Sequence, residues 1–101
     1  MSVVILSDVN FKENIQDKEV ALIDFYASWC GPCKMLSPIL EEISKENPNI
    51  FIGKVNIDFE REVTKLYNVW TIPTLIVFKK GLEVNRNVGF LPKDKILELV
   101  R

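Results

Sequence analysis

The chain contains two cysteines, separated by two residues in the segment Trp29-Cys30-Gly31-Pro32-Cys33. If this segment begins a helix, the second sulfur lies one turn behind the first, close enough for a disulfide. Such a pair can hold or release two electrons. A thiol at the start of a helix also meets unpaired backbone N–H groups and the positive end of the helix dipole, which lower its pKa. We therefore predict Cys30 as the attacking nucleophile and Cys33 as the resolving thiol.

The chain has no histidine, and this excludes several other kinds of chemistry. Ser-His-Asp catalysis, Cys-His catalysis and histidine zinc motifs all need an imidazole. A zinc site of four cysteines would need a second cysteine pair, and a structural disulfide in so short a loop would stabilise little. Two ordinary core cysteines would have no reason to flank Gly31, which lets the backbone turn, and Pro32, which suits an early helical position. Redox chemistry is therefore favoured over these three interpretations.

Length and charge limit the class of protein further. The 101 residues predict a single domain over 1–101, and the 13 basic against 14 acidic residues argue against binding to nucleic acid or to an anionic membrane. The longest apolar runs hold four residues, whereas a bilayer span needs about 20. Residues 1–4 have no basic start, so no secretory signal is expected, and a cytoplasmic location is favoured.

Strands and helices are expected to alternate along the chain. The predicted strands are 3–6, 20–27, 50–57, 74–78 and 82–88, and the predicted helices are 10–16, 32–46, a segment after Asp58 and a segment from Pro92. This β-α-β-α-β-α-β-β-α order predicts an α/β fold with a mixed five-stranded sheet flanked by helices. Sites in such sheets form beyond the carboxyl ends of strands, and Cys30 follows the central strand directly.

Local signals predict helix ends and buried faces. Asn10 and Glu13 resemble a capping box, and Asp58 is expected to cap the helix that follows it. Asn68 is expected to end that helix in a left-handed conformation, and Pro92 to take the first position of the last helix. Helical spacing predicts that the following residues form the apolar faces: Met35, Leu36, Ile39, Leu40, Ile43, Val63, Leu66, Tyr67, Ile96, Leu97 and Val100.

Asp24 interrupts the nearly continuous apolar strand 20–27, six residues before Cys30. Its apolar neighbours Ile23 and Phe25 favour a buried position over a solvated strand edge. A carboxylate that is buried without a full set of partners has a raised pKa. We therefore expect the pKa of Asp24 to be raised.

The sequence resembles the thioredoxin family over essentially its whole length. The matching segments follow the family's order: 24–27, 29–35, Pro38, 54–58, 72–74, Gly81 and 88–89. The resemblance implies the thioredoxin fold and a protein-disulfide reductase that acts in cell redox homeostasis. It also implies no bound cofactor or metal, electrons from a thioredoxin reductase, disulfide-containing protein substrates and a monomeric chain.

The resemblance further assigns roles around a redox disulfide between Cys30 and Cys33. It implies that Asp24 accepts the proton of Cys33, and that Lys54 on the neighbouring strand tunes Asp24. It implies a cis bond before Pro73, so that the Ile72 backbone faces an extended substrate segment. The substrate-binding residues that it implies are Trp29, Gly31, Pro32, Trp70, Thr71, Ile72, Pro73 and Gly89.

Alternatives remain at this stage. Within the class, a disulfide isomerase or oxidant is the rival, although such relatives usually carry histidine in place of Pro32. Outside it, the chain could be a redox-switched binding subunit of a partner protein, or could ligate a metal or an iron–sulfur cluster across a dimer. Trp70 stands where the family usually has a smaller or a basic residue, and Phe90 stands where it usually has a small one. We expect both to enlarge the apolar rim of the substrate groove.

Overall fold

A computed structural model describes residues 3–101, and the expectation drawn from Met1 and Ser2 lies outside them. The strands are β1 (Val4–Ile5), β2 (Ala21–Tyr26), β3 (Phe51–Asn56), β4 (Thr74–Lys79) and β5 (Leu82–Val88). The helices are α1 (Phe11–Ile15), α2 (Gly31–Glu46), α3 (Arg61–Leu66) and α4 (Lys93–Leu99). The predicted order of elements is confirmed, with most boundaries shifted by one or two residues.

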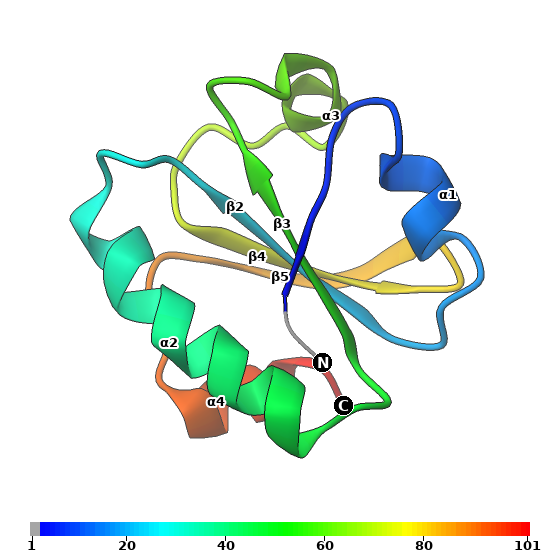
Figure 1. The fold of residues 1–101 in the computed structure, drawn as a ribbon, viewed down its shortest axis with the longest axis vertical. Helices are drawn as coiled ribbons and strands as arrows, with labels where there is room; N and C mark the ends of the chain where they lie inside the picture. Colours follow the sequence, from blue (N-terminus) through cyan, green and yellow to red (C-terminus); the bar gives the residue numbers. More distant parts are fainter. Residues whose placement is uncertain (1–2) are drawn as a thin grey trace.

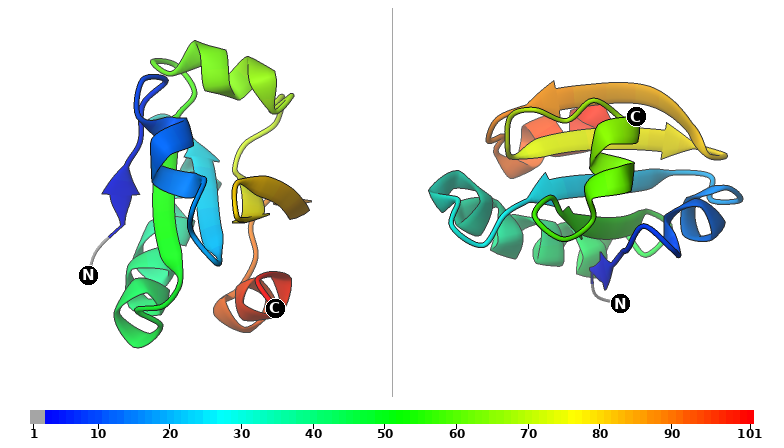
Figure 2. Two further views of the ribbon diagram at one scale, coloured as in Figure 1. Left: turned by 90° about the vertical axis from the view of Figure 1, so that its right-hand side faces the viewer. Right: turned by 90° about the horizontal axis from the view of Figure 1, so that it is seen from above.

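The five strands form one mixed sheet in the order β1-β3-β2-β4-β5. β1, β3 and β2 run parallel, whereas β4 pairs antiparallel with both β2 and β5. Helices α2 and α4 cover one face of the sheet and α1 and α3 the other (Figures 1 and 2). The central strand β2 leads at its carboxyl end into α2 (Figure 1), as the sequence predicts.

The alternation of side chains along β2 separates two hydrophobic cores. Ile23 and Phe25 pack on the side of α1 and α3, whereas Leu22 packs on the side of α2 and α4. Asp24 shares the face of Leu22 and therefore lies on the α2 side of the sheet. The core on that side consists of Leu22, Leu36, Leu40, Ile43, Ile52, Leu75, Val77, Ile96 and Val100.

The predicted helix ends are partly wrong. The Asn10 side chain does not cap α1, because its Oδ1 accepts a hydrogen bond from the Ser7 N–H at 2.8 Å instead, so the capping box with Glu13 is absent. Pro92 is the N-cap of α4 rather than its first residue, since its extended ψ of 165° places it just outside the helix. Asn68 does adopt the predicted left-handed conformation, with a φ of 54°.

The beginning of α3 is held from a distant part of the chain. The helix starts after Glu60 rather than at Asp58, and Asp8 accepts hydrogen bonds from the N–H groups of Val63 (2.8 Å) and Glu62 (3.4 Å). In return, the Glu60 carboxylate accepts the N–H of Asp8 at 2.9 Å. This reciprocal cap fixes the segment between β1 and α1 against α3.

Two residues predicted to face inward are exposed. Leu66 is 69% exposed because the six-residue helix α3 buries Val63 against the sheet and presents Leu66 away from it. Met35 is 62% exposed although the adjacent Leu36 is fully buried, because successive residues of a helix point about 100° apart and α2 turns Leu36 rather than Met35 toward the core.

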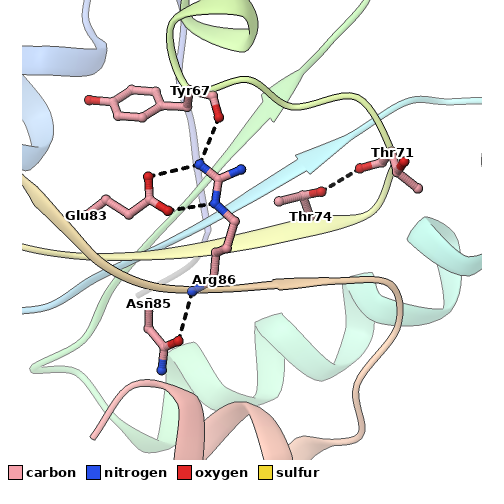
Figure 3. Close-up of polar contacts among 6 residues, drawn as sticks. All are labelled: Tyr67, Thr71, Thr74, Glu83, Asn85 and Arg86. Atoms are coloured by element: carbon pink, nitrogen blue, oxygen red, sulfur yellow. Dashed lines mark hydrogen bonds and ion pairs between the residues drawn. The ribbon is translucent and has the colours of Figure 1, made fainter.

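The hairpin of β4 and β5 is tied to the end of α3. Lys80 and Gly81 form its predicted tight turn, both with positive φ, and the strand register shifts between Val77 and Phe78. On β5, Arg86 makes a two-pronged ion pair with Glu83 and also donates to the carbonyl oxygen of Tyr67 at 2.8 Å (Figure 3). Among residues 3–101, no helix has the length and apolar character needed to cross a membrane.

Candidate active site

Cys30 and Cys33 form a disulfide at the N-terminus of α2, with Cα atoms 5.3 Å apart. Cys30 is the N-cap residue, and its Sγ accepts a hydrogen bond from the Cys33 N–H at 3.2 Å. Both cysteines are buried. In the reduced protein, the same N–H and the helix dipole favour the thiolate of Cys30, so the scaffold makes the two sulfurs unequal.

The residues that flank the cysteines leave the site open. Gly31 and Pro32 are exposed in the first turn of α2, and a Cβ at Gly31 would meet no atom within 4 Å. Trp29 is 68% exposed, and its Nε1 donates a hydrogen bond of 2.9 Å to Asp58 at the end of β3. This bond holds the indole beside the disulfide while leaving most of its surface available.

Asp24 is buried in the centre of the sheet, and its Oδ1 has no hydrogen-bond partner. Burial raises the pKa of Asp24 from 3.8 to about 7, although the positive charge of Lys54 opposes the rise. A cavity of about 270 Å³ is lined by both Asp24 and Cys33, together with Tyr26, Ala27, Ser28, Lys34, Ser37 and Lys54. The carboxyl group and Cys33 therefore line the same small cavity.

Lys54 is the register neighbour of Asp24 on β3. Its Nζ lies 5.2 Å from the centre of the Tyr26 ring, and within the described chain it forms no ion pair with Asp24. The ammonium thus acts on the carboxyl group through the cavity, while the aromatic face stabilises its position.

The segment before β4 forms the other wall of the site. The Ile72–Pro73 peptide bond is cis, and Ile72 packs against the cluster that contains Cys30 and Cys33. The Thr74 hydroxyl donates to the Thr71 carbonyl oxygen at 2.5 Å (Figure 3), and the Gly89 N–H donates to the Pro73 carbonyl oxygen at 2.7 Å. These bonds fix the turn and the end of β5 on either side of Pro73.

The structure brings most of the predicted site residues together at one end of the sheet. Trp70 is different: it is 87% exposed and lines a separate pocket beside α3. Phe90 is 38% exposed, next to Gly89. Within the described part of the chain, no group of three or more His, Cys, Asp or Glu side chains could hold a metal ion.

Two residues of this site were not predicted from the sequence. Asp58 was predicted to cap a helix but instead binds Trp29, and Ile57 packs beside Ile72 against the cysteines. A signal for both was present, because they follow β3, and the carboxyl ends of parallel strands meet at one edge of a sheet.

A disulfide that joins the N-cap of a helix to its first turn, beside a buried carboxyl group with a pKa near neutrality, is equipped for dithiol–disulfide exchange. This is the chemistry of a thiol-disulfide oxidoreductase.

Comparison with known proteins supports the same class of protein and identifies the family of the chain. The thioredoxin family model matches residues 2–101. Thioredoxin of Chlamydia trachomatis is 48% identical over 98 residues, covering 97% of this chain and 95% of that protein, and thioredoxin of Staphylococcus haemolyticus is 45% identical over 101 residues, covering 99% and 96%. The chain belongs to the thioredoxin family and acts as a protein-disulfide reductase.

Solved structures agree. A mutant thioredoxin from Halobacterium salinarum superposes with a TM-score of 0.91 at 31% identity, covering 98% of this chain and 88% of that one. Thioredoxin of Plasmodium falciparum superposes with a TM-score of 0.89 at 36% identity, covering 96% and 95%. The predicted thioredoxin fold is confirmed.

Proposed function

We propose that Asp24 is the proton acceptor that lets Cys33 complete each reduction. The observation that carries the proposal is the unpartnered Oδ1 of Asp24 in the cavity that Cys33 also lines. A carboxyl group with a pKa of about 7 is divided between its two protonation states near neutral pH, so it can both take up and release a proton there.

In the first step, the Cys30 thiolate attacks one sulfur of a substrate disulfide. A bond forms between Cys30 and that sulfur, the substrate S–S bond breaks, and the other substrate sulfur leaves as a thiolate. The helix N-terminus stabilises the attacking thiolate, while the exposed Gly31 and Pro32 leave room for the approach.

In the second step, Cys33 transfers its proton to Asp24 and attacks the Cys30 sulfur. The Cys30–Cys33 disulfide forms, and the substrate leaves with its second sulfur as a thiolate. Two electrons have then passed from the dithiol to the substrate. Lys54 tunes this step, because its charge keeps the pKa of Asp24 from rising further.

The substrate segment binds in an extended form along Ile72. Neither the N–H nor the C=O of Ile72 forms a hydrogen bond within residues 3–101, so both are available to pair with an added strand. We assign Trp29, Thr71, Pro73 and Gly89 to the same docking site, which presents the substrate disulfide to Cys30.

The cycle closes when a thioredoxin reductase reduces the Cys30–Cys33 disulfide. We place the protein in the cytoplasm, because a reductant of protein disulfides needs a compartment that keeps thiols reduced. In this role the chain works as a single domain and a monomer, with no bound cofactor.

Trapping of mixed disulfides tests the proposal. Cys33→Ser, incubated with a synthetic peptide disulfide, is expected to accumulate a covalent adduct through Cys30, whereas Cys30→Ser forms none. Asp24→Asn is expected to form the adduct at the wild-type rate but to resolve it slowly. Normal resolution by Asp24→Asn would contradict the role of Asp24, and adducts on Cys33 would contradict the order of attack.

A further inference from the structure

A pocket of about 210 Å³ lies beside the active site, between α3 and the segment before β4. Its lining includes Ile57, Asp58, Arg61, Lys65 and Trp70. Ile57 also packs against the cluster that contains Cys30 and Cys33, and Asp58 holds the indole of Trp29. The pocket therefore borders the residues that surround the disulfide.

The charge of this pocket is predominantly positive. Arg61 and Lys65 are four residues apart on α3, so they lie on the same side of the helix. Both are exposed, and neither forms an ion pair with another residue among 3–101. Asp58 is the one acidic residue of the lining, and its Oδ2 already accepts the Trp29 N–H. The two cations are free to bind an anionic group.

Trp70 connects the pocket to the path of the substrate. Its indole is 87% exposed and lies two residues before Ile72, on which we place the substrate segment. Since an extended chain advances about 3.3 Å per residue, a segment paired with Ile72 comes alongside Trp70 within a few residues. The indole offers an apolar wall for the methylene groups of a side chain whose end reaches the cations.

We infer that this pocket is a specificity subsite for an acidic side chain of the protein substrate, a few residues from the disulfide that Cys30 attacks. The inference rests on the proposed docking along Ile72. The planar guanidinium of Arg61 suits a carboxylate, and Lys65 adds a second charge. Charges at the rim of an interface chiefly accelerate association, and salt weakens their effect.

Peptide disulfides that differ in one residue test the subsite. Glu, Gln or Lys is placed in turn at successive positions on each side of the reactive cysteine, and kcat/KM is measured at low and high salt. At one or two positions, wild type should reduce the Glu peptide about three- to tenfold faster than the Gln peptide, and the Lys peptide more slowly still. The preference should disappear at high salt.

The matched variants are Arg61→Gln/Lys65→Gln at the pocket and Lys45→Gln/Arg101→Gln on exposed surface away from α3, which remove the same charge. The pocket variant should lose the preference for Glu while reducing the Gln peptide at the wild-type rate, and the distant variant should keep the preference. Equal rates on Glu and Gln peptides in wild type would overturn the subsite, as would a preference that survives in the pocket variant or is lost in both. Failure of wild type to reduce any of these peptides through Cys30 would instead overturn the proposed function, and the subsite with it.

Discussion

Asp24 and Lys54 occupy paired positions on adjacent parallel strands, yet the Lys54 ammonium lies over the Tyr26 ring, 5.2 Å from its centre, and makes no ion pair with the carboxyl group. Desolvation therefore dominates the titration of Asp24, and its pKa is about 7. A closer ion pair would favour the ionised carboxylate at neutral pH and weaken its ability to hold a proton. The separation between the two residues keeps Asp24 suited to proton transfer.

The first prediction concerns the pH dependence of catalysis. In wild type, resolution of the mixed disulfide should accelerate as pH rises through about 7, because Asp24 becomes an ionised base there. Asp24→Asn should slow this step at pH 7 by up to about 100-fold and remove the inflection. Single-turnover reduction of a peptide disulfide between pH 6 and 9 checks this, with the exposed Asp17→Asn as control. An unchanged pH profile in Asp24→Asn would contradict the prediction.

A second prediction isolates the charge of Lys54. Lys54→Met removes the one influence that lowers the pKa of Asp24, so that pKa should rise above 7. Titration of the Asp24 carboxyl carbon by NMR measures the shift directly. Lys79→Met on β4 is the control and should leave the titration unchanged. A pKa that stays the same or falls in Lys54→Met would show that the ammonium does not act on Asp24.

The buried carboxyl group also makes stability depend on pH. Asp24 titrates near 3.8 when unfolded but near 7 when folded, so between these values the unfolded chain releases a proton that the folded chain keeps. Its contribution to stability therefore falls as pH rises through this window and is constant above it. At pH 8, the free energy of unfolding of Asp24→Asn, measured with denaturant, should exceed that of wild type by up to about 4 kcal/mol. At pH 3 the two free energies should differ little. Equal gains at both pH values would argue against this linkage.

Asp8 caps α3 although it lies far from the helix in the sequence, so a substitution of Asp8 should lower the stability of the protein. Asp8→Ala leaves the N–H groups of Glu62 and Val63 without their acceptor and should lower the free energy of unfolding by about 1 kcal/mol. Urea denaturation measures the loss, and Asp17→Ala on the exposed surface is the control. Unchanged stability of Asp8→Ala would mean that water replaces the cap without cost.

Trp70 and Phe90 are expected to bias partner choice through their exposed apolar surfaces. Trp70→Ala and Phe90→Ala should each slow reduction of peptides with apolar residues near the disulfide by several-fold, because the groove then buries less apolar area. A small, uncharged dithio reagent serves as the control substrate and should react at the wild-type rate. Unchanged rates on apolar peptides in both variants would refute a role for this rim.

The alternation of strands and helices could be predicted from the sequence because its signals are local. The apolar run around Asp24 and the left-handed Asn68 each follow from their immediate neighbours. The cap of α3 could not be predicted, since it comes from Asp8, more than 50 residues away. The exposure of Leu66 likewise depends on how little of α3 the sheet covers.

The same limit applies to the site. The disulfide of Cys30 and Cys33 and its place at the start of a helix could be predicted from the spacing of the two cysteines and from the Gly-Pro between them. The cavity that joins Cys33 to Asp24, and the position of Lys54 over Tyr26, depend on side chains from different elements meeting in space. No spacing in the sequence encodes such a meeting.

The two edge strands of the sheet, β1 and β5, affect the tendency of the protein to aggregate. β1 pairs over only two residues. The register between β5 and β4 shifts at Val77 and Phe78 of β4, and β5 carries the ion pair between Glu83 and Arg86. Long, flat edges invite other chains to add strands, and short, irregular or charged edges discourage this. A protein-disulfide reductase must meet other chains, and these two edges discourage their addition as strands. In the docking that we propose, strand addition is confined to the short segment at Ile72.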